Sequence, residues 1–180
     1  LFKVKFKLKS GIYLSSMSHM FNRCSSLVSV NLSSLKSDNV KDLSFCFCLC
    51  HNLNKLNLKG LNTNNVTSMV GTFAYNTSVK SYDLSSFNFS RVSSCGAVFA
   101  SNSDLETIYS SPDASMGSCG TNSFSNKNSK IVGGNGTSAS SLDSGSSTYL
   151  RVDSPSNPGL FTVKENKYCN IYYSNSNSYQ

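Results

Sequence analysis

Residues 17–42, 43–68 and 69–94 read MSHMFNRCSSLVSVNLSSLKSDNVKD, LSFCFCLCHNLNKLNLKGLNTNNVTS and MVGTFAYNTSVKSYDLSSFNFSRVSS, and they align without a gap. A fourth unit, CGAVFASNSDLETIYSS, starts at Cys95 and keeps the same register through Ser111. The chain thus carries a 26-residue repeat. Self-similarity at a fixed period of this length is the sequence signature of proteins built from stacked units. We expect residues 17–111 to fold as one repeat array.

Apolar residues recur at six positions of the unit. The first two columns are Phe21, Phe47, Phe73 and Phe99, and Leu27, Leu53, Val79 and Leu105. The other four are Val30, Leu56, Tyr82 and Ile108; Leu32, Leu58 and Leu84; Leu35, Leu61 and Phe87; and Val40, Val66 and Val92. One unit cannot bury its apolar side alone, whereas stacked units turn each column into a continuous interior ladder. The sequence thus predicts a structural ladder along the core.

Within each unit, the pattern L-x-x-V/L-x-L predicts a short strand with one buried face. These strands are expected at residues 27–33, 53–59, 79–85 and 105–111, and they should run parallel. The preceding M-x-x-M-F-x-x-C segment has apolar residues three and four apart, which suits a short helical turn. The predicted fold is an α/β solenoid. It is a right-handed coil of leucine-rich-repeat type with a short parallel β-sheet, short helical turns opposite and an irregular C-terminal cap.

The flanking regions depart from the repeat. Residues 1–16 are predicted to form a strand and a partial coil, because apolar residues alternate with lysines and Leu14 falls in the Val40 column. After Ser111 the period fails, and Gly, Ser, Asn and Pro predict a capping segment over 112–166. Residues 167–180 should form a short strand and a polar tail. Because the chain starts inside a patterned strand without an initiator Met, we expect a fragment or a processed product.

Composition and charge limit the classes of function. Sixteen Lys and Arg against nine Asp and Glu give a net charge of +7. Four of the lysines alternate within the first nine residues, so the excess is partly local. The chain has no Arg-rich stripe or regular aromatic interleaving, which argues against nucleic-acid binding. No apolar run approaches the roughly 18 residues that would span a bilayer, so no membrane span is expected.

The cysteines invite chemical interpretations that the repeat weakens. Cys46, Cys48, Cys50 and His51 offer the ligand types of a zinc site, but two of these thiols fall in apolar columns of the repeat. A Cys-His nucleophile would need a third orienting group, and neighbouring residues usually point apart. We therefore predict no metal, no cofactor and no catalytic residue. Cys24 and Cys50 share a column at disulfide-compatible spacing, and two alternatives stay open: a disulfide, or an unpaired ladder.

The units M-F-x-x-C-x-x-L-x-x-L-x-L-S resemble the repeats of BspA-like leucine-rich repeat surface proteins. The resemblance extends to IVGGNGT and TYLRVDSPSNPGLFT, which are similar to the segment that often closes such arrays. It spans roughly residues 14–163, although the Phe-Cys pattern changes to Phe-Asn in the last two units. The resemblance implies a cell-surface or secreted protein, usually one module of a larger adhesin, that attaches to matrix proteins or other cells.

Function is therefore expected on the surface. The outward side chains of the strands include Lys55, Asn57, Lys59, Asp83 and Tyr109, which form the predicted partner-binding set. We expect a non-enzymatic adhesion or recognition module that binds a protein or glycan through this sheet face. The alternative is a structural or decorating repeat domain, a spacer or assembly subunit that contacts copies of itself or neighbouring domains.

Overall fold

A computed structural model describes residues 8–117, 119–124, 128–141 and 147–164 of the 180-residue chain. This part contains five short strands and two 3-10 turns. They are β1 (Ser29–Asn31), β2 (Lys55–Asn57), β3 (Ser81–Leu84), β4 (Thr107–Ser110), η1 (Ala139–Ser141), η2 (Ser147–Tyr149) and β5 (Phe161–Val163). The predicted strand and tail at 167–180 lie outside the described residues, as do residues 1–7 of the predicted N-terminal strand.

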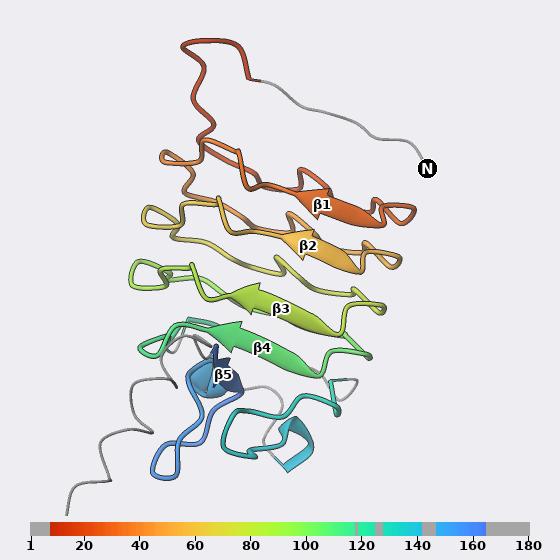
Figure 1. The fold of residues 1–180 in the computed structure, drawn as a ribbon, viewed down its shortest axis with the longest axis vertical. Helices are drawn as coiled ribbons and strands as arrows, with labels where there is room; N and C mark the ends of the chain where they lie inside the picture. Colours follow the sequence, from red (N-terminus) through yellow and green to blue (C-terminus); the bar gives the residue numbers. More distant parts are fainter. Residues whose placement is uncertain (1–7, 118, 125–127, 142–146, 165–180) are drawn as a thin grey trace, which may run out of the picture.

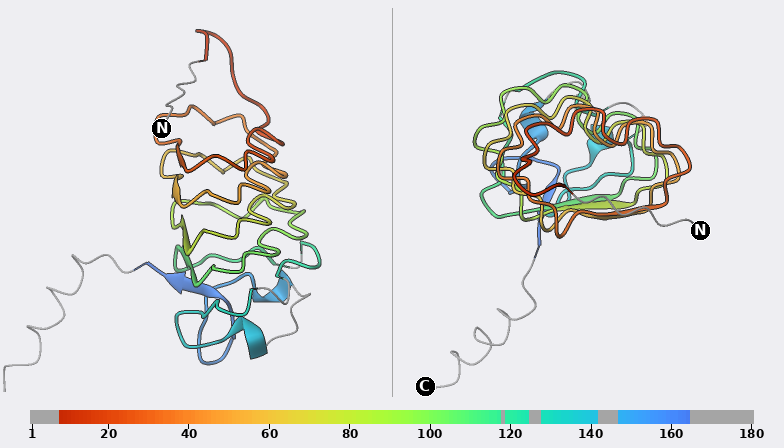
Figure 2. Two further views of the ribbon diagram at one scale, coloured as in Figure 1. Left: turned by 90° about the vertical axis from the view of Figure 1, so that its right-hand side faces the viewer. Right: turned by 90° about the horizontal axis from the view of Figure 1, so that it is seen from above.

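Strands β1 to β4 lie one above another along the long axis of the molecule (Figure 1). They belong to two parallel sheets, of order β1-β2 and β3-β4-β5. Ser29 pairs with Lys55 and Ser81 pairs with Thr107, so partners are separated by one repeat. Isolated parallel bridges join Ser16, Asp42, Ser68 and Ser94 in the same register. Each repeat unit thus forms one layer, and seen from above the layers superpose (Figure 2).

The segments that precede the strands are built from tight turns. Alternate backbone N–H groups of the first segment, those of Met17, His19, Phe21 and Arg23, donate to the carbonyl oxygens of Asp42, Ser44, Cys46 and Cys48 in the next layer. Between them, the N–H groups of Met20 and Asn22 donate three residues back, to the oxygens of Met17 and His19. The N–H of Ser18 donates to the hydroxyl of Ser16. Residues at two fixed positions adopt positive φ, such as Phe45 at 55° and Leu49 at 60°. We call residues 17–24 and their equivalents in later layers the turn wall.

The predicted α/β solenoid with helical turns is wrong. The described residues contain no α-helix, and their 3-10 turns lie in the C-terminal part, outside the turn wall. The strands also form two small parallel sheets and not one continuous sheet. The apolar spacing that indicated helix suits successive tight turns equally well. In a helix every interior N–H bonds within its own segment, whereas tight turns leave alternate N–H groups free for the adjacent layer.

The interior is arranged as stacks of equivalent side chains. Phe21, Phe47, Phe73 and Phe99 lie nearly parallel, with ring centroids 5.3, 5.9 and 5.6 Å apart. Leu53, Val79 and Leu105 are buried, and Leu27 in the first layer is half-buried. Gly60 allows two layers to approach closely, because a Cβ there would lie 2.2 Å from the carbonyl oxygen of Ser33. Offset aromatic stacking and apolar burial therefore hold the layers together.

A buried polar ladder replaces the cysteine column in the later layers. The Oδ1 atom of Asn76 accepts a hydrogen bond from the backbone N–H of Cys50 at 2.9 Å. Asn102 accepts one from the N–H of Asn76 at 2.8 Å, and its amide nitrogen donates to the carbonyl oxygens of Phe73 and Phe99. Both asparagines are fully buried. These amides satisfy backbone groups that would otherwise be buried without partners.

The turn wall continues beyond the last recognisable repeat. The N–H groups of Cys95, Ala97 and Phe99 donate to the oxygens of Cys119, Thr121 and Ser123. In the layer before, the N–H of Met69 donates to the oxygen of Ser94. The separation along the chain between Cys95 and Cys119 is one residue shorter than that between Met69 and Ser94. Phe124 extends the aromatic stack, with its centroid 5.9 Å from that of Phe99. A one-residue deletion therefore hides a further layer from the sequence period.

Residues 128–141 and 147–164 cover the C-terminal end of the stack. Strand β5 pairs in parallel with β4, placing Phe161 beside Ile108. The loop 133–137 wraps around the buried carboxylate of Asp153, which accepts hydrogen bonds from the N–H groups of Asn135, Thr137 and Gly159 and from the Thr137 hydroxyl. Burial opposes ionisation of Asp153, but these hydrogen bonds outweigh it and lower the pKa of the carboxyl group. The Gly-rich loop GGNG thus anchors a structural carboxylate.

The polar ladder should contribute strongly to stability. Replacing Asn102 by Ala removes the acceptor of the Asn76 N–H and the donor to two carbonyl oxygens, so we expect a loss of about 3 kcal/mol in the free energy of unfolding. Asn52 is exposed and serves as the control, since Asn52→Ala should change stability by less than about 0.5 kcal/mol. Denaturant titrations of both variants measure the difference. Equal stabilities would contradict the role assigned to the ladder.

The Asp153 carboxylate should make the stability of the fold depend on pH in the acidic range. Because its folded-state pKa is lowered, the ionised group stabilises the fold above its ordinary pKa of 3.8 and this contribution is lost as pH falls through the folded pKa. Asp153→Asn, which cannot accept at both oxygens, should cost about 2 kcal/mol at pH 7. The difference in the free energy of unfolding between wild type and variant should become smaller below about pH 4. Thermal unfolding from pH 7 to 2 tests this, and a constant gap would contradict it.

Candidate functional site

The outward side chains of the strands form two rows. Pairing places Ser29 beside Lys55 and Asn31 beside Asn57 in the first sheet, and Asp83 beside Tyr109 in the second. Strand alternation points these side chains away from the core, where Tyr82 and Ile108 are buried. The predicted binding residues are thus divided. Lys55, Asn57 and Lys59 belong to β2 and the turn after it, whereas Asp83 and Tyr109 lie on the other sheet.

Two of the predicted binding residues also close turns of the backbone. The Oδ1 atom of Asn57 accepts a hydrogen bond from the N–H of Lys59, at 3.2 Å. Asp83 accepts equivalent bonds from the N–H and hydroxyl of Ser85, at 3.2 and 2.6 Å. Asn31 does the same with the N–H of Ser33. The recurrence of Asn or Asp two residues before the donor N–H is the sequence signal for this turn-closing role.

An ion pair modifies the charge of this face. Lys164, which follows β5, donates a hydrogen bond from its Nζ atom to the carboxylate of Asp83. Burial disfavours the ionised carboxylate, but the bonds from Lys164 and Ser85 prevail and the pKa of Asp83 is lowered. The two residues are 81 positions apart, so no local pattern predicts the pair. Asp83 is consequently less available to a partner than its sequence position suggested.

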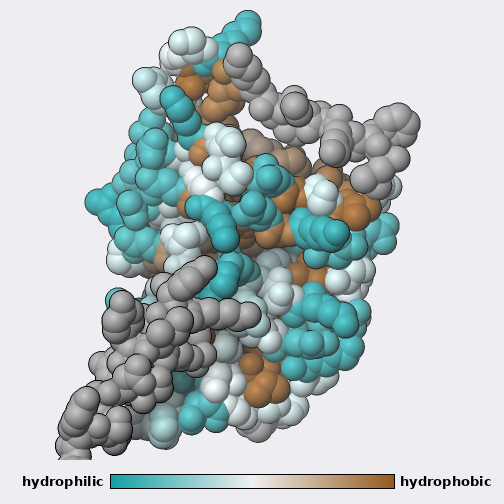
Figure 3. Space-filling model, in the orientation of Figure 1, coloured by the Kyte–Doolittle hydropathy of each residue, from teal (hydrophilic) through white to brown (hydrophobic). Residues whose placement is uncertain are grey.

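The lysines of β2 and of the turn after it remain accessible. Lys55 and Lys59 are exposed, and within the described residues neither forms an ion pair. Polar side chains dominate the face seen in Figure 3, with smaller apolar areas among them. Tyr109 is half-buried beside Thr162 of β5. The sheet face is therefore polar, and its free charge on β2 is positive.

The cysteine cluster lies in the core. Cys46, Cys48 and Cys50 are buried, while His51 is exposed. Burial raises the pKa of all three thiols, that of Cys50 to about 11. The Sγ atom of Cys50 donates to the carbonyl oxygen of Phe21 at 3.0 Å. Among the described residues, no group of three or more His, Cys, Asp and Glu is placed to hold a metal ion. At neutral pH these thiols are protonated and weakly nucleophilic.

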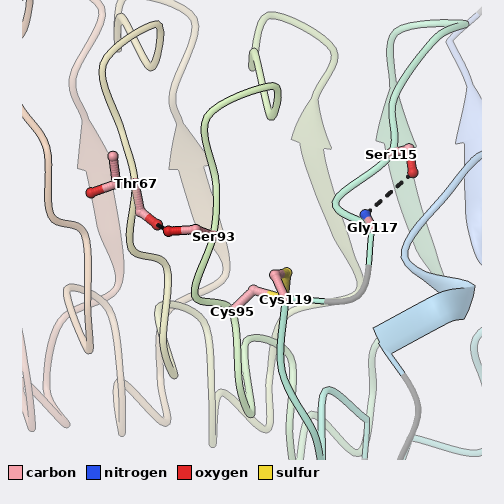
Figure 4. The surroundings of a disulfide bond; sticks show 6 residues. All are labelled: Thr67, Ser93, Cys95, Ser115, Gly117 and Cys119. Carbon is pink, nitrogen blue, oxygen red and sulfur yellow. Dashed lines mark hydrogen bonds between the residues drawn. A yellow bond between two sulfur atoms is a disulfide. The ribbon is translucent and has the colours of Figure 1, made fainter.

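The disulfide of the structure is not the one considered from the sequence. Cys24 and Cys50 are free thiols, and Cys24 is exposed. Cys95 bonds instead to Cys119, with Cα atoms 5.2 Å apart (Figure 4). Cys95 occupies the buried column of Met17, Leu43 and Met69. Because Cys119 lies in the layer shortened by one residue, the repeat period could not reveal its partner. The bridge ties the last clear repeat to that layer.

The thiols should differ sharply in reactivity. We expect iodoacetamide to label Cys24 at pH 8 in the folded protein, because its side chain is exposed. Cys46, Cys48 and Cys50 should be labelled only after unfolding, since they are buried and their thiol pKa values are raised. Mass spectrometry of tryptic peptides before and after denaturation measures both sets. Rapid native labelling of Cys50 would contradict the burial.

The part of the chain that the structure describes has no helix of the length and apolarity needed to cross a membrane. Comparison with curated proteins and with solved structures finds no match. One family model matches residues 15–130, which include all four repeat units and the shortened turn-wall layer. The match extends over more than half of the chain. The chain therefore belongs to the family described as "Mycoplasma protein of unknown function, DUF285".

Proposed function

We propose that this chain is a non-enzymatic recognition module of a BspA-like leucine-rich repeat surface protein. It acts at the cell surface or after secretion, and it binds an anionic protein or glycan through the sheet face. The family match supports the surface-protein class, and the repeat motifs of residues 17–111 support the finer assignment.

The observation that carries the proposal is the pair of accessible lysines on β2 and the turn after it. Lys55 begins β2, and Lys59 lies in the turn that follows the strand. The hydrogen bond from the Lys59 N–H to the side chain of Asn57 holds the backbone of this turn. Lys164 pairs with Asp83 on the neighbouring sheet, so that carboxylate is already engaged and does not compensate the two lysines. A rigid backbone that presents two unpaired cations favours carboxylate or sulfate groups of a partner.

A second candidate, a spacer or assembly subunit, is favoured by a different observation. Met20 in the first layer is 43% exposed, whereas the equivalent residues of later layers are buried. An apolar side chain left open at one end of the stack is suited to contact with another protein segment. Light scattering separates the two candidates. Self-association without affinity for matrix components would favour the spacer.

Charge reversal of the two lysines tests the adhesion proposal. Lys55→Glu combined with Lys59→Glu should weaken binding to heparin or to a matrix protein at least about tenfold, because two attractive contacts become repulsive. Affinity of the wild type should also fall as salt rises from 50 to about 300 mM, through screening. Surface plasmon resonance with immobilised partner measures both effects.

The matched control reverses two other exposed lysines outside the strands, Lys36 and Lys41. Lys36→Glu with Lys41→Glu changes the net charge equally and should leave most of the affinity intact. If both double variants lose affinity to the same extent, binding follows net charge and the sheet-face site is wrong. Absence of any measurable binding by the wild type would contradict the adhesion proposal itself.

A further inference from the structure

A hollow of about 310 Å³ lies between the segment that follows β4 and the chain that leads into β5. Residues 112–115 form one part of its lining, and residues 151, 152, 154 and 157 form the other. Ligand pockets in proteins usually measure about 300–1000 Å³. The hollow therefore has room for a ligand at the small end of that range.

Backbone hydrogen bonds join the two segments that line the hollow. The N–H of Met116 donates to the oxygen of Leu150 at 2.9 Å, and the N–H of Val152 donates to the oxygen of Ala114 at 3.2 Å. Between these bonds, residues 115 and 151 form an antiparallel bridge. Residues that lie opposite each other in such a bridge present their side chains on the same face. The lining is thus built on paired backbone.

The loop after Arg151 folds back toward this residue. Ser154 and Asn157 form an antiparallel bridge, and each N–H donates to the oxygen of the other, at 3.3 and 3.1 Å. The N–H of Gly159 donates to the buried carboxylate of Asp153 at 3.1 Å. A Cβ at Gly159 would lie 2.3 Å from the carbonyl oxygen of Arg151, so this approach requires glycine. The loop that contributes residues 154 and 157 to the hollow is therefore held in place.

Arg151 supplies a positively charged group whose orientation is fixed. Its Nε atom donates a hydrogen bond to the carbonyl oxygen of Pro158 at 2.9 Å. Within the described part of the chain, no protein group accepts a hydrogen bond from its two terminal nitrogens. A guanidinium group binds a carboxylate through two parallel N–H donors. Arg151 is therefore suited to bind the carboxylate of a ligand.

Asp113 supplies the opposite charge to the same hollow. Its side chain is exposed, and among the residues that the structure describes neither Asp113 nor Arg151 forms an ion pair. The hydroxyl group of Ser115, which accepts a hydrogen bond from the N–H of Gly117 at 3.3 Å, adds a neutral polar group (Figure 4). A simple anion would be repelled by Asp113, and a simple cation would be repelled by Arg151. A ligand that carries both charges satisfies the two residues together.

We propose that this hollow binds a small zwitterion, an α-amino acid or a dipeptide. The carboxylate of the ligand pairs with Arg151, and its ammonium group pairs with Asp113. The apolar side chains of Ala114 and Val152, which also line the hollow, face the aliphatic part of the ligand. Because the two backbone charges carry the recognition, the side chain of the ligand matters less. The proposal does not rest on the adhesion proposal, since it uses no residue of the sheet face.

Titration of the isotope-labelled full chain with L-alanine and with L-alanyl-L-alanine tests the site. We expect at least one of them to shift the backbone amide signals of Ser115 and Val152 saturably in NMR spectra, and the tighter ligand identifies the source. Acetylation of its amino group or amidation of its carboxyl group removes one charge, so each capped ligand should bind at least about tenfold more weakly. If neither parent ligand gives saturable shifts, the site is wrong. If the acetylated ligand binds as tightly as its parent, the hollow accepts a plain anion and the zwitterion proposal is overturned.

Variants of the two charged residues assign the contacts. Arg151→Gln and Asp113→Asn should each raise the dissociation constant of the tighter ligand at least about tenfold, because each removes one ion pair. Arg23→Gln and Glu106→Gln are the matched controls, since both residues are exposed and neither lines the hollow. The controls should stay within about twofold of the wild type. Equal losses in the variants and their controls would contradict the site, and the capped ligands test the wild type even if a variant fails to fold.

Discussion

The backbone hydrogen bond between equivalent positions of successive layers is the constraint on which this structure depends. It fixes the register of every unit at one repeat, so that each side chain lies on its counterpart from the neighbouring layer. The phenylalanine stack, the buried leucines and the asparagine ladder all follow from this register. An insertion within a unit would break the bonds and the columns together. The shortened fifth turn-wall layer shows that one deleted residue is tolerated where the last unit gives way to the C-terminal segment.

The same constraint decides the local conformation of the turn wall. A segment can bond to both neighbouring layers only if alternate N–H groups and carbonyl oxygens point along the stack. Tight turns with a left-handed residue at two fixed positions achieve this geometry, although the positive φ is unfavourable for side chains such as Phe45, Leu49 and Tyr75. The energy of the hydrogen bonds between layers offsets that local cost. Glycine occupies one of these positions in the third layer, at Gly71, where φ is 57°.

The surface chemistry is likewise shaped by structural demands. Asn57 and Asp83 are held by the turns that they close, and Lys164 is held by Asp83, so part of the outward face serves the fold itself. Lys55 and Lys59 remain exposed, and within the described residues neither forms an ion pair. This surface is charged and suited to polar ligands.

The sequence by itself determined the repeat length, the strand positions and which residues stack, because a constant period and a two-residue alternation are visible along the chain. It also indicated that Cys46 and Cys50 belong to interior columns. The conformation of the turn wall was decided only by the tertiary structure, since three- and four-residue apolar spacing fits a helix and consecutive turns alike. The tertiary structure alone also decided the Cys95–Cys119 disulfide and the Asp83–Lys164 ion pair. Both join residues across the point where the period changes, and their proximity arises from stacking and the path of the C-terminal segment, which no local pattern encodes.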